Sequence, residues 1–330
     1  MEDKACRVPV SPSEKPEGIC LWCGRRLHYW GDANSGFCHD RVAYGRCESC
    51  GSLGQVCALT PQELGQAYSK SYWVEDGNSS LLQQLAIWYQ RLILAWDHGR
   101  FLRQELGQIK GKRLLEIGPG RGDFLRWAKA QGAEVMGWER SPQAVALLHS
   151  HGLAAESVVL EEVSQWPAPT RAWDVIVGFH VLEHLVSPAE VVAALLPRLA
   201  PQGVLVLQVP RIDSFQSRLF GRRWVGLDPP RHVTVPSLKG LRKLASHLNL
   251  EETGTKQFSL RDNAFHILVS LLPSIDPHRP GCGGLKLVWL LIGSWCLQPL
   301  AILEAFAGRG GTVMMAFRKT KLPFKVDGDQ

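Results

Sequence analysis

Residues 114–124 restrict the fold of this chain more than any other segment. They read Leu-Leu-Glu-Ile-Gly-Pro-Gly-Arg-Gly-Asp-Phe, an apolar strand followed by three glycines on alternate positions and the start of a helix. Glycines without Cβ atoms let backbone N–H groups approach a ligand closely, while the following helix directs its positive end at the same point. The segment therefore predicts a ligand cradle between a strand and a helix of an α/β fold.

The spacing of the glycines narrows the choice of ligand. A dinucleotide fingerprint places its third glycine three residues after the second, whereas here Gly122 follows Gly120 by two and Asp123 comes next, which disfavours a pyrophosphate. Glu116 near the strand end, and Glu139 after the apolar segment 134–138, suit a ligand that carries an ammonium group and a ribose diol. This combination resembles class I S-adenosylmethionine-dependent methyltransferases.

The resemblance implies S-adenosylmethionine as the cofactor and assigns roles to named residues. Glu116 would face the ammonium group, and Glu139 would accept hydrogen bonds from both ribose hydroxyls. The glycine turn would approach the methionine part, and the segment after the fourth strand would form the far wall. These further predicted cofactor residues are Gly118, Gly120, Gly122, Phe179 and His180.

Strands and helices alternate from residue 112 onward, which predicts a doubly wound parallel sheet. The expected strands are 113–117, 134–138, 155–159, 173–179, 203–209, 250–260 and 311–318. The expected helices are 123–131, 142–151, 188–199 and 237–248. The resemblance makes the sheet Rossmann-like and seven-stranded, with an antiparallel last strand. We expect the methyltransferase domain to span 111–330, with substrate-side insertions at 210–236 and 261–309.

Two copies of a Cys-x-x-Cys-Gly knuckle lie near the N-terminus, formed by Cys20, Cys23, Cys47 and Cys50. Their spacing predicts a zinc ribbon over 19–60 in which the four thiolates bind a structural zinc. Cys38 and His39 lack the knuckle spacing. Prolines make 1–18 a predicted flexible leader, and apolar residues at helical spacing predict a helical connector within 61–110. The absence of a signal-peptide pattern leads us to expect a cytoplasmic protein.

The predicted catalytic residues are His232 and Arg231, which follow two prolines in the first insertion. An oxygen or carbon acceptor must lose a proton during methyl transfer, and histidine is the commonest base at neutral pH. The alternative is a structural turn. Glu183 and His184 resemble part of a metal-binding motif of some ubiquinone O-methyltransferases, although His180 stands at its first position. A structural role is favoured for this pair, and a divalent ion stays as the alternative.

The second insertion contains no charged side chain between residues 287 and 303. This run is short for a spanning helix and contains Pro299, so we expect a hairpin that contacts the membrane peripherally or covers a long-chain substrate. A buried helical pair or a dimer contact is the alternative. The expected acceptor is a hydrophobic, lipid-linked or glycan molecule used in biosynthesis.

Two other functions stay open, an RNA methyltransferase and a non-catalytic membrane-associated scaffold. The net charge of +6 is concentrated after residue 210, where the sequence has 17 basic and nine acidic side chains. Residues 1–60 carry seven of each, so the ribbon has no positive excess for a polyanion and we expect no nucleic-acid partner.

Overall fold

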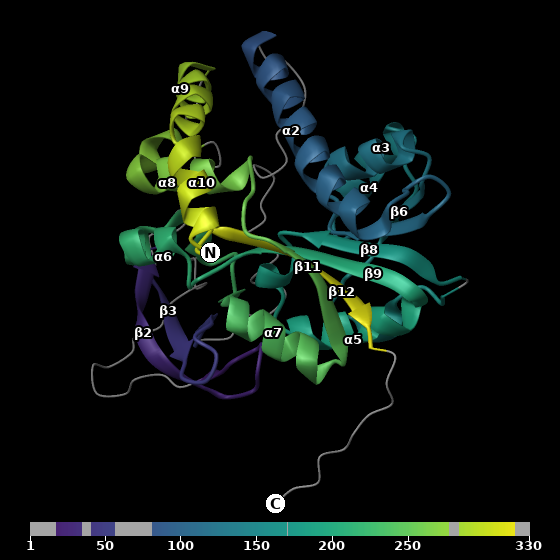
Figure 1. Ribbon diagram of the computed structural model, residues 1–330, viewed down its shortest axis with the longest axis horizontal. Coiled ribbons are helices and arrows are strands. Elements are labelled where there is room, and N and C mark those ends of the chain that lie inside the picture. The colour runs from purple at the N-terminus through teal and green to yellow at the C-terminus, as the bar shows by residue number, and fades with distance from the viewer. Residues whose placement is uncertain (1–17, 35–40, 57–80, 170, 277–283, 321–330) are drawn as a thin grey trace, which may run out of the picture.

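The computed structural model describes residues 18–34, 41–56, 81–169, 171–276 and 284–320 (Figure 1). Residues 1–17 of the predicted leader, most of the segment before the connector helix and the thiols of Cys6, Cys38, Cys57 and Cys282 lie outside these ranges.

A seven-stranded sheet forms the centre of the molecule, in the order β11-β12-β9-β8-β5-β6-β7. Its strands are β5 (Arg113–Ile117), β6 (Glu134–Glu139), β7 (Ala155–Ser157), β8 (Trp173–Phe179), β9 (Leu199–Pro210), β11 (Leu250–Lys256) and β12 (Thr312–Lys319). The five strands from β5 to β9 are mutually parallel, and β12 is inserted antiparallel between β9 and β11. The predicted α/β fold class is confirmed, including the antiparallel last strand.

Helices cover both faces of this sheet (Figure 1). On one face lie α2 (Leu81–Leu106), α3 (Asp123–Ala130) and α4 (Pro142–Ser150), and on the other lie α5 (Pro188–Leu195) and α7 (Leu238–His247). The central strands are apolar on both sides because both sides are covered, and residues such as Leu114 and Leu115 of β5 are completely buried. Serine side chains at Ser141 and Ser237 cap α4 and α7 by accepting a hydrogen bond from the first turn.

The N-terminal segment forms a second, antiparallel sheet of five strands, ordered β1-β2-β3-β4-β10. The first four are β1 (Gly18–Ile19), β2 (Arg26–Asn34), β3 (Arg41–Cys47) and β4 (Leu53–Gln55). The fifth strand, β10 (Thr234–Val235), comes from the end of the first insertion. The predicted ribbon and the predicted insertion therefore share one sheet, which the sequence pattern did not indicate.

The second insertion folds into α8 (Asp262–Leu271), α9 (Gly284–Cys296) and α10 (Gln298–Phe306). Helix α9 and the N-terminal half of α2 project together from one side of the molecule (Figure 1), and the rings of Tyr89 and Trp295 lie 6.1 Å apart. Within the described residues, no single helix has the length and apolar composition to cross a bilayer. The segments Val288–Cys296 and Gln298–Phe306 reach that composition only together, with a bend of 44° between them.

Candidate functional site

The glycine turn after β5 has the backbone conformation that its sequence predicts. Gly118, Gly120 and Gly122 have φ angles of 63°, 54° and 73°, in the left-handed region that residues with a Cβ avoid. Space is also limited, because a Cβ on Gly118 would lie 2.7 Å from Cγ2 of Val181. The turn leads directly into α3, whose first residue is Asp123. Strand, turn and helix N-terminus thus form the cradle expected for a ligand.

Glu116 lies at the end of β5 beside this turn and is 4% exposed. Burial raises its pKa well above the usual value, and the nearby acids Asp123 and Glu139 raise it further. Among the described residues, no group donates a hydrogen bond to its Oε2 atom. A buried carboxylate oxygen without a donor is costly unless a ligand supplies one, so this position suits a bound ammonium group.

Glu139, the last residue of β6, folds back onto the glycine turn. Its Oε2 accepts a hydrogen bond from the N–H of Gly120 at 3.0 Å, and its Oε1 accepts one from the N–H of Ser141 at 3.1 Å. Burial raises the pKa of this carboxyl, and the two backbone N–H groups oppose the rise. The predicted ribose-binding residue is therefore held at the cradle by the turn itself.

Phe179, which is predicted to line the far wall, packs against aromatic rings from two other elements. Phe179, at the end of β8, packs edge-on against Phe124 of α3, with ring centroids 4.9 Å apart. It also stacks on His98 of α2, with centroids 3.9 Å apart and an interplanar angle of 17°. His98 is 3% exposed. Helix α2 therefore covers this end of the sheet, a contact that the apolar spacing of α2 did not identify.

His180 follows Phe179 with a φ of 56° and belongs to a buried charged network. Its Nδ1 lies 3.1 Å from Oε1 of Glu183, and its Nε2 lies 3.2 Å from Oδ2 of Asp262 in α8. Burial lowers the pKa of His180, but the two carboxylates outweigh it and raise the pKa to about 9. The second insertion is thereby tied to the end of β8. Its direct contact with a cofactor stays a prediction.

A second group of polar side chains brings together Glu183, His184 and His232, whose potential ligand atoms all lie within 4.8 Å of one another. Nδ1 of His184 donates to the carbonyl of Arg231 at 3.0 Å, and Nδ1 of His232 donates to the carbonyl of Gly226 at 2.9 Å. These bonds fix the tautomer in which each Nε2 carries the lone pair. Burial lowers the pKa of both histidines to about 4, so both are neutral at pH 7.

Arg231, the other predicted catalytic residue, is 5% exposed and forms a two-point ion pair. Its Nε and one terminal nitrogen donate to the carboxylate of Asp228 at 2.7 and 2.8 Å. Asp228 has a φ of 35° and ends the short turn η6 (Val225–Leu227). The sequence reasoning did not identify Asp228, although an acid three residues before an arginine in a Pro-Pro turn was a visible signal.

The four predicted cysteine ligands do meet in the structure. Sγ of Cys20 lies 3.5 Å from Sγ of Cys50, Sγ of Cys23 lies 3.4 Å from Sγ of Cys47, and all four sulfurs are within 4.8 Å of one another. Gly24 and Gly51 end the knuckles with φ angles of 68° and 81°. Tetrahedral Zn–S bonds of about 2.3 Å place sulfurs roughly 3.8 Å apart, so this cluster fits zinc.

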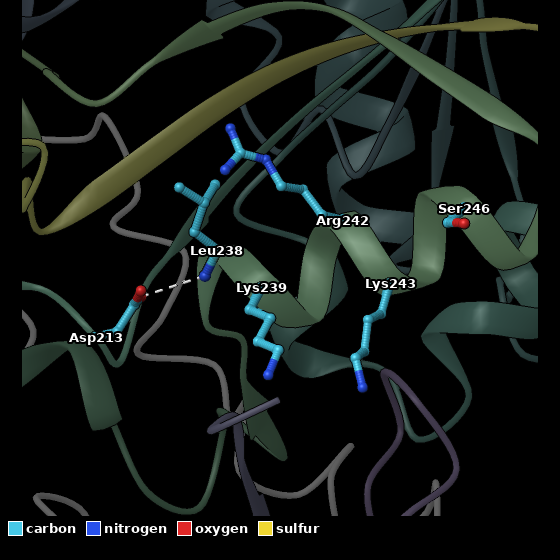
Figure 2. A pocket seen from close by; sticks show the side chains of 6 residues that line it. All are labelled: Asp213, Leu238, Lys239, Arg242, Lys243 and Ser246. Carbon is cyan, nitrogen blue, oxygen red and sulfur yellow. Dashed lines mark hydrogen bonds between the residues drawn. The ribbon is translucent and has the colours of Figure 1, made fainter. Parts of the chain in front are cut away.

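A separate cavity of about 450 Å³ opens beside α7. Its lining residues are Asp213, Leu238, Lys239, Arg242, Lys243 and Ser246 (Figure 2). The side chains of Lys239 and Lys243 extend from the same side of the helix, and Nζ of Lys243 donates to Oγ of Ser49 in the ribbon. Its basic lining suits an anionic group, but it includes none of the predicted cofactor or catalytic residues.

Comparison with known proteins agrees with this arrangement. Residues 89–253, half of the chain, match a family model described as a methyltransferase domain. The chain is 30% identical over 157 residues to ubiquinone biosynthesis O-methyltransferase of Histophilus somni (strain 2336). The alignment covers 44% of this chain and 62% of that protein. It is 32% identical over 120 residues to tRNA U34 carboxymethyltransferase of Desulfotalea psychrophila. That alignment covers 35% of this chain and 38% of the relative. The matches thus span less than two thirds of either relative.

The solved structures to which this chain is similar include that of a putative sarcosine dimethylglycine methyltransferase from Galdieria sulphuraria. It is 16% identical, with a TM-score of 0.49, and the alignment covers 78% of this chain and 98% of that one.

Proposed function

This chain belongs to the methyltransferase domain family, and from that premise we propose that it transfers the methyl group of S-adenosylmethionine to a hydrophobic, lipid-linked or glycan acceptor. The observation that carries the proposal is the buried Glu116 carboxylate beside the glycine turn, whose Oε2 lacks a donor among the described residues. The cofactor would supply an ammonium group to that oxygen and a methyl group on a positively charged sulfur. The chain has to align this methyl group with the acceptor atom, because an in-line displacement depends mainly on orientation.

At the cofactor end, Glu116 and Glu139 would bind the polar ends of S-adenosylmethionine, and the glycine turn would allow close backbone contact. Calorimetry with S-adenosylmethionine tests this assignment. We expect Glu139→Ala to weaken binding by about 10- to 100-fold, as the loss of a charge-assisted hydrogen-bond acceptor predicts. Glu134→Ala, at the exposed start of β6, is the control and should bind like the wild type. Equal binding by wild type and Glu139→Ala would contradict the proposal.

At the acceptor end, we propose that His232 receives the proton that an oxygen or carbon acceptor loses. Its Nδ1 is committed to the carbonyl of Gly226, which leaves the Nε2 lone pair to accept the proton. This imidazole is a weak base, because burial lowers the pKa of His232 to about 4. Arg231 would position this turn through its ion pair with Asp228. Replacing His232 by asparagine should lower turnover while S-adenosylmethionine binding stays unchanged.

The side chains of Glu183, His184 and His232 also fit a divalent metal ion. Among the described residues, Oε2 of the fully buried Glu183 has no hydrogen-bond partner. Potential ligand atoms of Glu183, His184 and His232 lie within 4.8 Å of one another, close enough to share one ion. A set of two imidazoles and one carboxylate suits zinc, iron or manganese. An ion held by Glu183, His184 and His232 would lower the pKa of an acceptor hydroxyl and so supply the function of the base. Elemental analysis distinguishes a metal ion at this site from His232 acting alone as the base. The ion would be additional to the zinc that we propose for the four cysteines.

The exposed apolar surface supports a hydrophobic or lipid-linked acceptor and a peripheral membrane contact. Helices α2, α9 and α10 expose Trp88, Leu92, Trp96, Trp289, Ile292, Trp295, Leu300, Ile302, Leu303 and Phe306. So many exposed apolar side chains on adjoining elements are unusual for a surface that faces only water, and tryptophan favours the membrane interface.

The acceptor class is tested by incubating the full chain with S-adenosylmethionine labelled with tritium in its methyl group. The acceptors offered are a lipid extract, a polysaccharide extract and total RNA. We expect label in the lipid or polysaccharide fraction. Label in RNA alone would favour the RNA methyltransferase alternative, and an absence of cofactor binding would favour the non-catalytic scaffold.

A further inference from the structure

The cysteine ribbon and the predicted acceptor-side turn are joined by main-chain hydrogen bonds. Strand β10 pairs antiparallel with β4, so that Thr234 lies opposite Gly54 and Val235 opposite Leu53. The N–H of Gln55 also donates to the carbonyl of Val233 at 2.8 Å. Since β10 begins two residues after His232, the ribbon fixes the backbone immediately beyond the proposed base.

Two ribbon side chains reach further and bind His232 itself. The hydroxyl of Tyr44, on β3, donates to the carbonyl of His232 at 2.8 Å. Nε2 of Gln55, on β4, donates to the same carbonyl at 3.0 Å and to the carbonyl of Pro230 at 2.9 Å. Tyr44 is completely buried, so its hydrogen bond to His232 forms where no water competes for the carbonyl.

The knuckles that carry the thiols hold the other end of the same segment. Nε1 of Trp22, between the first two cysteines, donates to Oγ1 of Thr234 at 2.7 Å. The hydroxyl of Ser237 donates to the carbonyl of Cys50, and the N–H of Ser237 donates to Oγ of Ser52. Most of segment 230–237 is therefore bound by residues of the sheet that carries the cysteine knuckles.

From these contacts we propose that the cysteine ribbon is the positioning element of the acceptor site, in which Tyr44 and Gln55 fix the orientation of His232. The inference rests on the proposed function, because it takes His232 as a residue of the acceptor end. Three contacts locate His232: the ribbon binds its backbone carbonyl, its Nδ1 donates to the carbonyl of Gly226, and its ring packs edge-to-face with the His184 ring, with centroids 4.6 Å apart. Loss of the ribbon contacts releases the first of these.

A ribbon that recognises a separate partner would present its knuckles and its sheet edge to solvent. Here Trp22 of the first knuckle is 2% exposed, and β10 occupies the edge of β4. The Trp22 side chain and the edge of β4 are therefore already used inside the chain, which favours the internal role.

Hydrogen exchange measured by mass spectrometry on the full chain tests the proposal without knowledge of the acceptor. In Tyr44→Phe, the amides of 226–235 should exchange at least 10-fold faster than in the wild type, while those of 113–139 keep their protection. Tyr29→Phe is the matched control, because this ribbon tyrosine is 40% exposed and its hydroxyl donates to Oδ1 of Asp32 within the ribbon, at 3.0 Å. Unchanged exchange at 226–235 in Tyr44→Phe would overturn the proposal.

Kinetics separate positioning from simple stabilisation. With the tritiated cofactor and the extract that the wild type methylates, Tyr44→Phe should lower kcat at least 10-fold and leave KM for S-adenosylmethionine within twofold. Gln55→Met removes the second donor at similar size and should lower kcat in the same way. This variant provides an independent test in case Tyr44→Phe does not fold. A uniform loss of protection across the chain, or an unchanged kcat, would overturn the positioning role. Faster exchange confined to 226–235 in Tyr44→Phe, together with a wild type that transfers no methyl group, would support the ribbon contact and contradict the proposed function.

Discussion

The hydroxyl of Tyr44 donates a hydrogen bond to the backbone carbonyl of His232, although 188 positions separate the two residues in the sequence. One residue belongs to the N-terminal ribbon and the other to an insertion of the methyltransferase domain. The acceptor end that we propose would consequently be built by two parts of the chain that a sequence-based division places in separate domains. A strand from the insertion also completes the ribbon sheet.

Replacing Gly118 by alanine should destabilise the fold and abolish cofactor binding. Alanine would adopt a φ of 63° at a cost of about 1–2 kcal/mol, and its Cβ would collide with Val181 for about 1–3 kcal/mol more. Gly152→Ala is the matched control, since Gly152 has a φ of 68° but only the end of the Lys129 side chain within 4.0 Å. Urea denaturation should give a clearly larger loss for Gly118→Ala, and similar losses would contradict the packing argument.

Replacing Cys47 by serine should remove the zinc that we propose for the ribbon. Elemental analysis should give one zinc fewer per chain than in the wild type, because a site with three thiolates and a hydroxyl binds zinc much more weakly. Cys296→Ser alters an exposed thiol in α9 and should leave the zinc content unchanged. An equal zinc content in Cys47→Ser and wild type would disprove the four-cysteine site.

Glu304 should make stability fall as pH rises from about 4.5 to 7. Burial raises its pKa to about 7, above the 4.5 of an unperturbed glutamate, so the folded state binds more protons than the unfolded state in this interval. The loss is at most about 3–4 kcal/mol and is complete above pH 7. In Glu304→Gln, urea denaturation should show a flatter pH profile, since Oε1 can still accept from Gln216 and Asn263.

The control for this pH profile is Glu156→Gln, which alters an exposed carboxylate and should keep the slope of the wild type. A slope that persists in Glu304→Gln would assign the effect to another group.

Removing aromatic side chains from α9 and α10 should reduce binding to vesicles. Trp289 is 61% exposed and Phe306 is 86% exposed, and transfer of such side chains into the interface contributes through their apolar area. In flotation with vesicles of phosphatidylethanolamine and phosphatidylglycerol, a Trp289→Gln and Phe306→Gln double variant should float less than the wild type. Val163→Gln, at an exposed apolar residue of η2 (Val163–Gln165), should float like the wild type. Absence of the wild type from the floating fraction would contradict membrane contact.

Much of the cofactor half could be predicted because its signals are local. The strand before Gly118, the three glycines and the helix that begins at Asp123 follow one another within a dozen residues, and each has its own backbone requirement. Glu139 could be placed because it ends the next strand of a parallel sheet. The predicted strands and helices of the central sheet accordingly lie within a few residues of the observed ones.

The contacts between distant segments were harder to predict. Nothing around Asp262 indicates that its carboxylate lies beside His180, and nothing around His98 indicates that its ring stacks on Phe179. Both residues come from helices whose apolar pattern gives the buried face but not the element that it contacts. The pairing of β10 with β4 was missed for the same reason, because a two-residue strand carries too little pattern to be recognised.

The sequence by itself determined the family of the chain, the α/β sheet, the glycine cradle and the cysteine knuckles, because each depends on residues that are close in the chain and restrict their own backbone. Only the tertiary structure decided that His232 meets Glu183 and His184, and that the ribbon holds His232 through Tyr44. Contacts between distant segments are selected by how whole elements pack and bury their polar groups, and no local pattern records that choice.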